Sequence, residues 1–130
     1  MDIITKETMI EKLLAACPSF EPQWREFLEE WRDEPHEPPV YVALGDFAFH
    51  LAAMLERGET NSFPGIFSAI ENLHLRGDSF VREAATIGIL ESLQNKSVAE
   101  QFRPFLEPET ERWWDKLNRF WNGDPTALRE

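Results

Sequence analysis

Cysteine is almost absent from this chain. Cys17 is the only one in 130 residues, which excludes an internal disulfide. It lies in the helical pattern of residues 9–17, so we interpret it as a small buried apolar side chain rather than a nucleophile. Long apolar runs are also absent, and none approaches the ~18 residues that a membrane-spanning helix needs. The first seven residues lack the basic and then apolar regions of a secretory signal, so we expect a cytoplasmic protein that does not enter a membrane.

Basic residues are scarce, with 13 Lys and Arg against 24 Asp and Glu, and the formal net charge is −11. Such a charge repels the phosphates of nucleic acids and of anionic membranes at long range, which argues against either as a ligand. The imbalance is uneven, because residues 1–65 hold 13 acidic and 5 basic side chains, whereas residues 66–130 hold 11 and 8. We therefore expect one part of the surface to carry a concentrated negative field.

Apolar and aromatic residues are abundant: 42% of the chain is hydrophobic, and 15 residues are Phe or Trp. No run alternates with period two, whereas apolar residues recur at helical spacing in long segments. The pattern predicts an all-α compact bundle of about five to seven helices in a single domain over 1–130, with residues 124–130 frayed. The expected helices cover residues 5–16, a segment beginning near 22, 40–57, 63–76, 79–95, 97–102 and a segment from 107 to 123.

Capping residues mark several helix ends. Asp78 can cap the helix that follows Gly77, and Ser97 with Glu100 has the spacing of a capping box. The two helices that meet at Gly77 resemble a HEAT-type antiparallel hairpin, in which the second helix opens with an acidic cap and a Val-Arg pair. No second copy is visible, so we do not expect an extended solenoid, which needs about three repeats.

The segment after Pro22 carries two opposed stripes. The apolar stripe consists of Trp24, Phe27, Leu28 and Trp31, and the acidic stripe of Glu26, Glu29, Glu30 and Asp33, which Glu34 and Glu37 continue into a proline-rich connection. Like charges at this spacing each cost a helix a few tenths of a kcal/mol. Such a stripe is therefore either a solvated face that arose by chance or a site for something basic. We predict that these six acidic residues form a partner-binding surface.

Aromatic residues are densest near the C-terminus, at Trp113, Trp114, Phe120 and Trp121. Tryptophan is enriched both in cores and among the residues that dominate protein interfaces. Adjacent residues point about 100° apart on a helix, so at least one of Trp113 and Trp114 should lie at the edge of the core. We include both as candidate partner contacts.

Two pairs of polar residues have spacings that suggest chemistry. Asp46 and His50 lie one turn apart on an otherwise apolar helix, where a carboxylate could orient an imidazole base. No Ser, Cys or Gly-rich loop stands near them, so we interpret the pair as a structural hydrogen bond. Glu71 and His74 have the i, i+3 spacing of di-iron ligands, but the required second copy is missing. We expect an exposed helix position there, with no metal, no cofactor and no catalytic residue.

Four segments resemble a family of small bacterial proteins of uncharacterised function. They are LGDFA at 44–48, GILESLQN at 88–95, FRPFL at 102–106 and WWDKLNRFWNG at 113–123. The family is similar in size and acidity to the immunity proteins that accompany bacterial toxins. This resemblance implies a cytoplasmic immunity protein that neutralises a basic toxin domain by direct binding through its acidic surface. The alternatives are a HEAT-like adaptor and an enzyme that uses Asp46 and His50.

Overall fold

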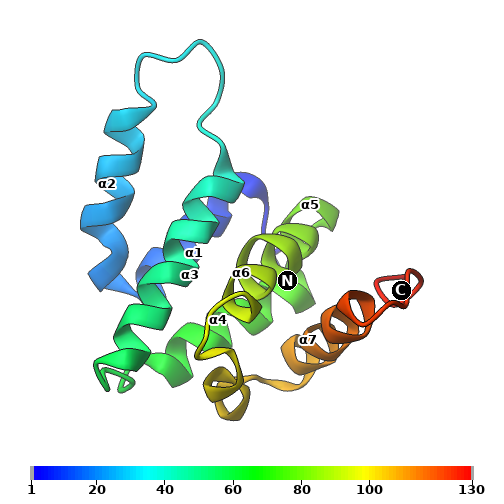
Figure 1. The fold of residues 1–130 in the computed structure, drawn as a ribbon. Helices are drawn as coiled ribbons and strands as arrows, with labels where there is room; N and C mark the ends of the chain where they lie inside the picture. Colours follow the sequence, from blue (N-terminus) through cyan, green and yellow to red (C-terminus); the bar gives the residue numbers. More distant parts are fainter. Residues whose placement is uncertain (1, 130) are drawn as a thin grey trace.

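The computed structural model describes residues 2–129, and every regular element in this range is a helix, so the predicted all-α class is confirmed. Figure 1 shows the elements packed as a bundle. They are α1 (Lys6–Ala16), η1 (Pro18–Phe20), α2 (Glu21–Glu30), α3 (Val40–Glu56), α4 (Phe63–Arg76), α5 (Ser79–Glu83), η2 (Ala84–Leu90), α6 (Glu91–Gln94), η3 (Ala99–Phe105) and α7 (Pro108–Trp121). None of these helices is both long enough and apolar enough to cross a membrane.

Helix α3 lies in the core because it is apolar on nearly every face. Its Leu44, Phe47 and Leu51 are all buried. Helix α3 packs against η2, and Gly88 of η2 permits the close approach. A Cβ atom at Gly88 would lie 2.7 Å from Cδ1 of Leu44, so a larger residue would force the two helices apart or displace the leucine.

Elements α5, η2 and α6 form one continuous helix over residues 79–94, close to the predicted 79–95. Its first turn is capped as predicted, because Oδ1 of Asp78 accepts a hydrogen bond from the backbone N–H of Val81 at 2.9 Å. The middle of this helix, Ala84–Leu90, has π geometry, in which each N–H bonds five residues back. The hydrophobic periodicity did not predict this change of geometry.

The short helix before α7 differs from the prediction. It is the 3₁₀ helix η3, which begins at Ala99 and contains Pro104 rather than ending before it. Its N-cap is Val98 and no side chain caps it, so the capping box predicted from Ser97 and Glu100 is wrong.

The C-terminal segment contacts α7. Ala127 is buried, and Nζ of Lys116 donates a hydrogen bond to the backbone carbonyl of Arg129 at 2.8 Å. Residues 124–129, for which we predicted a frayed end, thus include contacts with the rest of the fold, and Glu130 lies outside the described residues.

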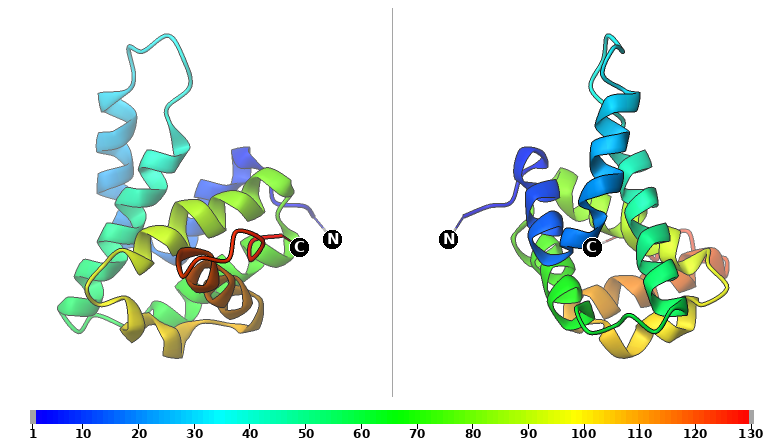
Figure 2. Two further views of the ribbon diagram at one scale, coloured as in Figure 1. Left: turned by 45° about the vertical axis from the view of Figure 1, so that its right-hand side comes forward. Right: turned by 90° about the vertical axis from the view of Figure 1, so that its left-hand side faces the viewer.

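Helix α2 and the connection that follows it project from the rest of the molecule. In Figures 1 and 2, α2, residues 31–39 and the start of α3 extend beyond the other helices. Helix α2 packs on η1 and α3, where it buries Phe27 but leaves Leu28 40% exposed. We call α2 together with residues 31–39 the arm. Because the arm projects, much of its surface is free of core contacts.

Candidate functional site

All six acidic residues of the predicted binding surface are exposed on the arm. Phe27 is buried on the opposite side of α2, as the spacing of the two stripes predicted. Helix α2 ends at Glu30, so Asp33, Glu34 and Glu37 lie in the non-helical connection rather than on a longer helix. The fold thus gathers these carboxylates on one projecting element.

Two cations of the chain offset part of this negative charge. Arg32 lies 2.6 Å from the Glu29 carboxylate and 3.6 Å from that of Asp33. Nζ of Lys6, from α1, lies 2.6 Å from the Glu37 carboxylate. Three acidic residues of the arm take part in none of the described ion pairs: Glu26, Glu30 and Glu34. Their charge faces water uncompensated.

A groove of about 220 Å³ lies between α1 and the base of the arm. We call it the arm groove, and its lining is Lys6, Glu7, Ile10, Trp24, Phe27, Leu28, Glu37, Pro38 and Val40. Its floor is aromatic where the rings of Trp24 and Phe27 stack with centroids 5.5 Å apart. The sequence identified the apolar stripe of α2 but not the groove, because the groove exists only where α1 leaves that stripe partly uncovered.

The ion pair between Lys6 and Glu37 joins α1 to the connection beside this groove. Their 2.6 Å hydrogen bond raises the pKa of Lys6 and lowers the pKa of Glu37. Nζ of Lys6 also lies 5.5 Å from the ring centroid of Phe80, within the range of a cation–π contact. A cation is therefore held next to the apolar groove.

The two adjacent tryptophans of α7 have different environments. Trp114 is fully buried, so it is a core residue and not an available partner contact. Trp113 is half-buried, and the cations of Arg112 and Lys116 lie 5.2 and 4.4 Å from its ring. Of this pair, only Trp113 remains accessible to a partner.

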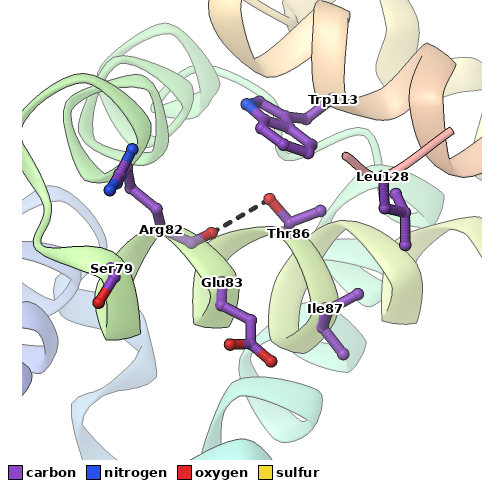
Figure 3. A pocket seen from close by; sticks show the side chains of 7 residues that line it. All are labelled: Ser79, Arg82, Glu83, Thr86, Ile87, Trp113 and Leu128. Carbon is purple, nitrogen blue, oxygen red and sulfur yellow. Dashed lines mark hydrogen bonds between the residues drawn. The ribbon is translucent and has the colours of Figure 1, made fainter. Parts of the chain in front are cut away.

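A larger cavity of about 380 Å³ lies between the helix of residues 79–94 and α7. Its lining is Ser79, Arg82, Glu83, Thr86, Ile87, Trp113 and Leu128. In Figure 3, Trp113 and Leu128 lie across from Thr86, whose hydroxyl donates to the backbone carbonyl of Arg82 at 3.1 Å. One wall of this cavity thus comes from a C-terminal segment that was expected to fray.

Asp46 and His50 do not form the predicted hydrogen bond. Asp46 is exposed, whereas the buried His50 contacts Ser19 through Nε2 at 2.8 Å and the amide nitrogen of Gln23 through Nδ1 at 2.9 Å. Because an amide nitrogen only donates, Nδ1 accepts, and in the neutral ring Nε2–H donates to Ser19. Burial lowers the pKa of His50 and so favours that neutral ring. In this arrangement His50 fixes η1 against α3 and does not accept a proton from Ser19.

Glu71 and His74 are buried, contrary to the expected exposed position. The Glu71 carboxylate accepts hydrogen bonds from the backbone N–H groups of Glu109 and Thr110 at 3.0 and 2.8 Å, and from the Thr110 hydroxyl at 2.7 Å. The ring nitrogens of His74 each lie 3.2 Å from a hydroxyl, that of Thr110 or that of Thr86. Burial lowers the pKa of His74 to about 4. This network fastens α7 to α4, and within residues 2–129 no three His, Cys, Asp or Glu side chains are grouped to hold a metal ion.

Residues 10–122 match a family model described as a domain of unknown function, DUF7674, and the chain belongs to that family. The match agrees with the resemblance to a family of uncharacterised function and includes the whole arm. No curated protein and no solved structure matches the chain.

Proposed function

We propose that this DUF7674 protein is a non-catalytic binding domain that captures a basic protein partner through the acidic surface of its arm. The observation that carries the proposal is the exposure of all six carboxylates on a projecting element. Three of them, Glu26, Glu30 and Glu34, take part in no described ion pair. Since none of these six side chains is buried, core packing does not explain why acidic residues occupy these positions.

The charge of the arm favours rapid capture of a cationic surface. Residues 21–37 hold seven acidic and two basic side chains, a net charge of −5. Opposite charges steer two proteins together and raise the association rate, while like charges reject wrong partners. The arm concentrates almost half of the net charge of the chain in 17 residues, so its field is local and directional.

A toxin domain with a basic active site or substrate groove is the partner class that fits best. An acidic projection can cover such a groove and exclude the substrate without any chemistry of its own. The small size and acidity of the chain, in which it is similar to immunity proteins, support this assignment. We place this stoichiometric neutralisation in the cytoplasm.

The test uses the protein encoded by the gene next to this one. It is first produced in cells with and without the present protein to see whether it harms them, and is then purified so that its association rate can be measured by stopped flow. The double variant Glu26→Lys with Glu30→Lys should associate about tenfold more slowly at low salt, with a flatter dependence on ionic strength. The matched control is Glu11→Lys with Glu56→Lys, which changes the net charge equally at exposed positions outside the arm. Equal rates for the two double variants, or a neighbouring protein that neither harms cells nor binds, would contradict the proposal.

A further inference from the structure

We propose that the arm groove anchors one apolar side chain of the partner, carried on a basic helical segment whose own cation replaces Lys6 at Glu37. The inference rests on the proposed function, because it specifies the chemistry of the partner that the arm captures. It adds an apolar contact and an exchange of ion pairs to the electrostatic attraction.

The size and lining of the arm groove suit a single large apolar side chain. An apolar cavity of about 150 Å³ holds a benzene ring, and the arm groove has about 220 Å³. The half-buried ring of Trp24, which stacks on the buried Phe27, offers an apolar surface, and Leu28 beside it is 40% exposed. An aromatic or leucine side chain seated there would remove Leu28 from water, which is how interface anchors gain most of their affinity.

The charges around the arm groove select a basic partner over a second copy of this chain. Glu7 and Glu37 belong to the lining itself, and the other acidic residues of the arm follow along the same element. A second copy would bring another arm with a net charge of −5 towards this one, and the two would repel. On a helix, a cation three or four residues from an apolar anchor lies on the same face, so it can reach a carboxylate beside the groove.

Glu37 is the carboxylate best placed to receive that cation. Its side chain is 78% exposed while it is paired with Lys6, so a second cation can approach it from solvent. An arginine binds a carboxylate through two parallel hydrogen bonds, whereas a lysine offers a point charge, so an incoming arginine can displace Lys6. The released Lys6 keeps its contact with the ring of Phe80.

The probe is a labelled peptide of about 14 residues, long enough for partial helix formation, with one leucine near its centre and arginines three and four residues away from it. The control peptide has this leucine replaced by alanine and therefore carries the same charge. Fluorescence anisotropy should show the leucine peptide binding about tenfold more tightly than the alanine peptide. Leu28→Asp should abolish this difference, whereas Leu75→Asp, at a leucine that is 59% exposed on α4, should preserve it.

The ion-pair exchange has its own variants. Lys6→Ala removes the internal competitor and should tighten binding of the leucine peptide more than Lys12→Ala, which removes the same charge from an exposed position on α1. Glu37→Gln should weaken binding of the leucine peptide. In the Glu37→Gln background, the further change Lys6→Ala should have no effect on binding. Additive effects of Lys6→Ala and Glu37→Gln would overturn the exchange.

The outcomes separate this inference from the proposed function. If both peptides bind equally and Glu26→Lys with Glu30→Lys weakens both, the arm binds by charge alone and the anchor site is overturned while the proposed function stands. If Glu26→Lys with Glu30→Lys changes the binding of neither peptide, the acidic surface of the arm does not attract cations, and the proposed function itself is contradicted. If neither peptide binds and the protein self-associates in a manner that Leu28→Asp abolishes, the groove belongs to a second copy and the inference is wrong.

Discussion

The carboxylate of Glu71 on α4 caps the N-terminus of α7 by accepting hydrogen bonds from the backbone N–H and the hydroxyl of Thr110. The two residues are 39 positions apart in the sequence, so a buried side chain of one helix satisfies the free donors of another. A negative charge at this helix end is also favoured by the helix dipole. The pair therefore determines where α7 docks.

Removal of the Glu71 carboxylate should destabilise the protein strongly. Glu71→Ala leaves buried donors of α7 without an acceptor, which costs about 3 kcal/mol in the free energy of unfolding. For a chain of this size the melting temperature should fall by roughly 10 °C. Thermal unfolding followed by circular dichroism measures the change, with Glu100→Ala at an exposed position as the control. A loss below about 1 kcal/mol would show that α7 docks without this cap.

Acid should destabilise the protein through His74. Burial lowers its pKa from the ordinary value of 6.5 to about 4 in the folded chain, so between these values the unfolded chain binds more protons. The contribution of the neutral His74 to the free energy of unfolding is therefore complete above pH 6.5. It declines as the pH falls towards about 4, by up to about 3 kcal/mol. Urea unfolding at several pH values should show this slope, and His74→Gln should flatten it. His36→Gln, at an exposed histidine of the arm, should leave it unchanged.

Alanine should have opposite effects at two helical glycines, one at the contact between η2 and α3 and one in an open position on α4. Gly88→Ala places a Cβ atom 2.7 Å from Cδ1 of Leu44 in a packed core, which should cost about 1–3 kcal/mol. Gly65→Ala, in α4, meets no atom within 4 Å and should stabilise its helix by about 0.5–1 kcal/mol. Denaturant unfolding of both variants provides the comparison. If the two variants changed the free energy of unfolding equally, η2 and α3 would be able to move apart to accept the methyl group at no cost.

Helices were predictable wherever local pattern and burial agree. Helix α3 is apolar on almost every face, and its bounds of 40–56 differ from the prediction by one residue. The capping box at Ser97 failed because a cap contributes about 1 kcal/mol, less than the burial of a phenylalanine such as Phe102, which lies in η3 and is fully buried. The apolar residues of Ala84–Leu90 fit an ordinary helical period, so the local pattern did not predict the π geometry of this segment, which packs against α3.

The candidate site was predictable only where it depends on one element. The exposure of Glu26, Glu29 and Glu30 follows from the helical period of α2, whereas Asp33 is exposed in the connection beyond the end of that helix. The arm groove needs α1, the partners of His50 come from around η1, and the partner of Glu71 lies on α7. The hydrogen bonds of His50 and Glu71 join residues 27 to 39 positions apart, and the groove joins two separate helices, so sequence spacing cannot reveal them.

Substitutions at Asp46 and His50 should separate the predicted pair from the observed contacts. His50→Ala removes a buried ring with two hydrogen bonds and should cost about 2 kcal/mol, whereas Asp46→Ala at an exposed position should change stability by less than about 0.5 kcal/mol. Ring nitrogen chemical shifts measured by NMR should show the proton of His50 on Nε2. A proton on Nδ1 would reverse the hydrogen bond to Ser19 and make that serine a candidate nucleophile.

Tryptophan variants on α7 should show whether recognition involves this helix. Trp114→Ala removes a fully buried side chain and should cost about 4 kcal/mol, so any loss of binding in that variant reflects unfolding. Trp113→Phe keeps an aromatic ring at a half-buried position and should preserve the fold. If the arm is the binding surface, Trp113→Phe should associate with the partner at the rate of the unmodified protein, because its ring lies by the larger cavity and not in the arm groove. A folded Trp113→Phe variant that no longer binds, alongside an arm variant that still does, would move the site to α7.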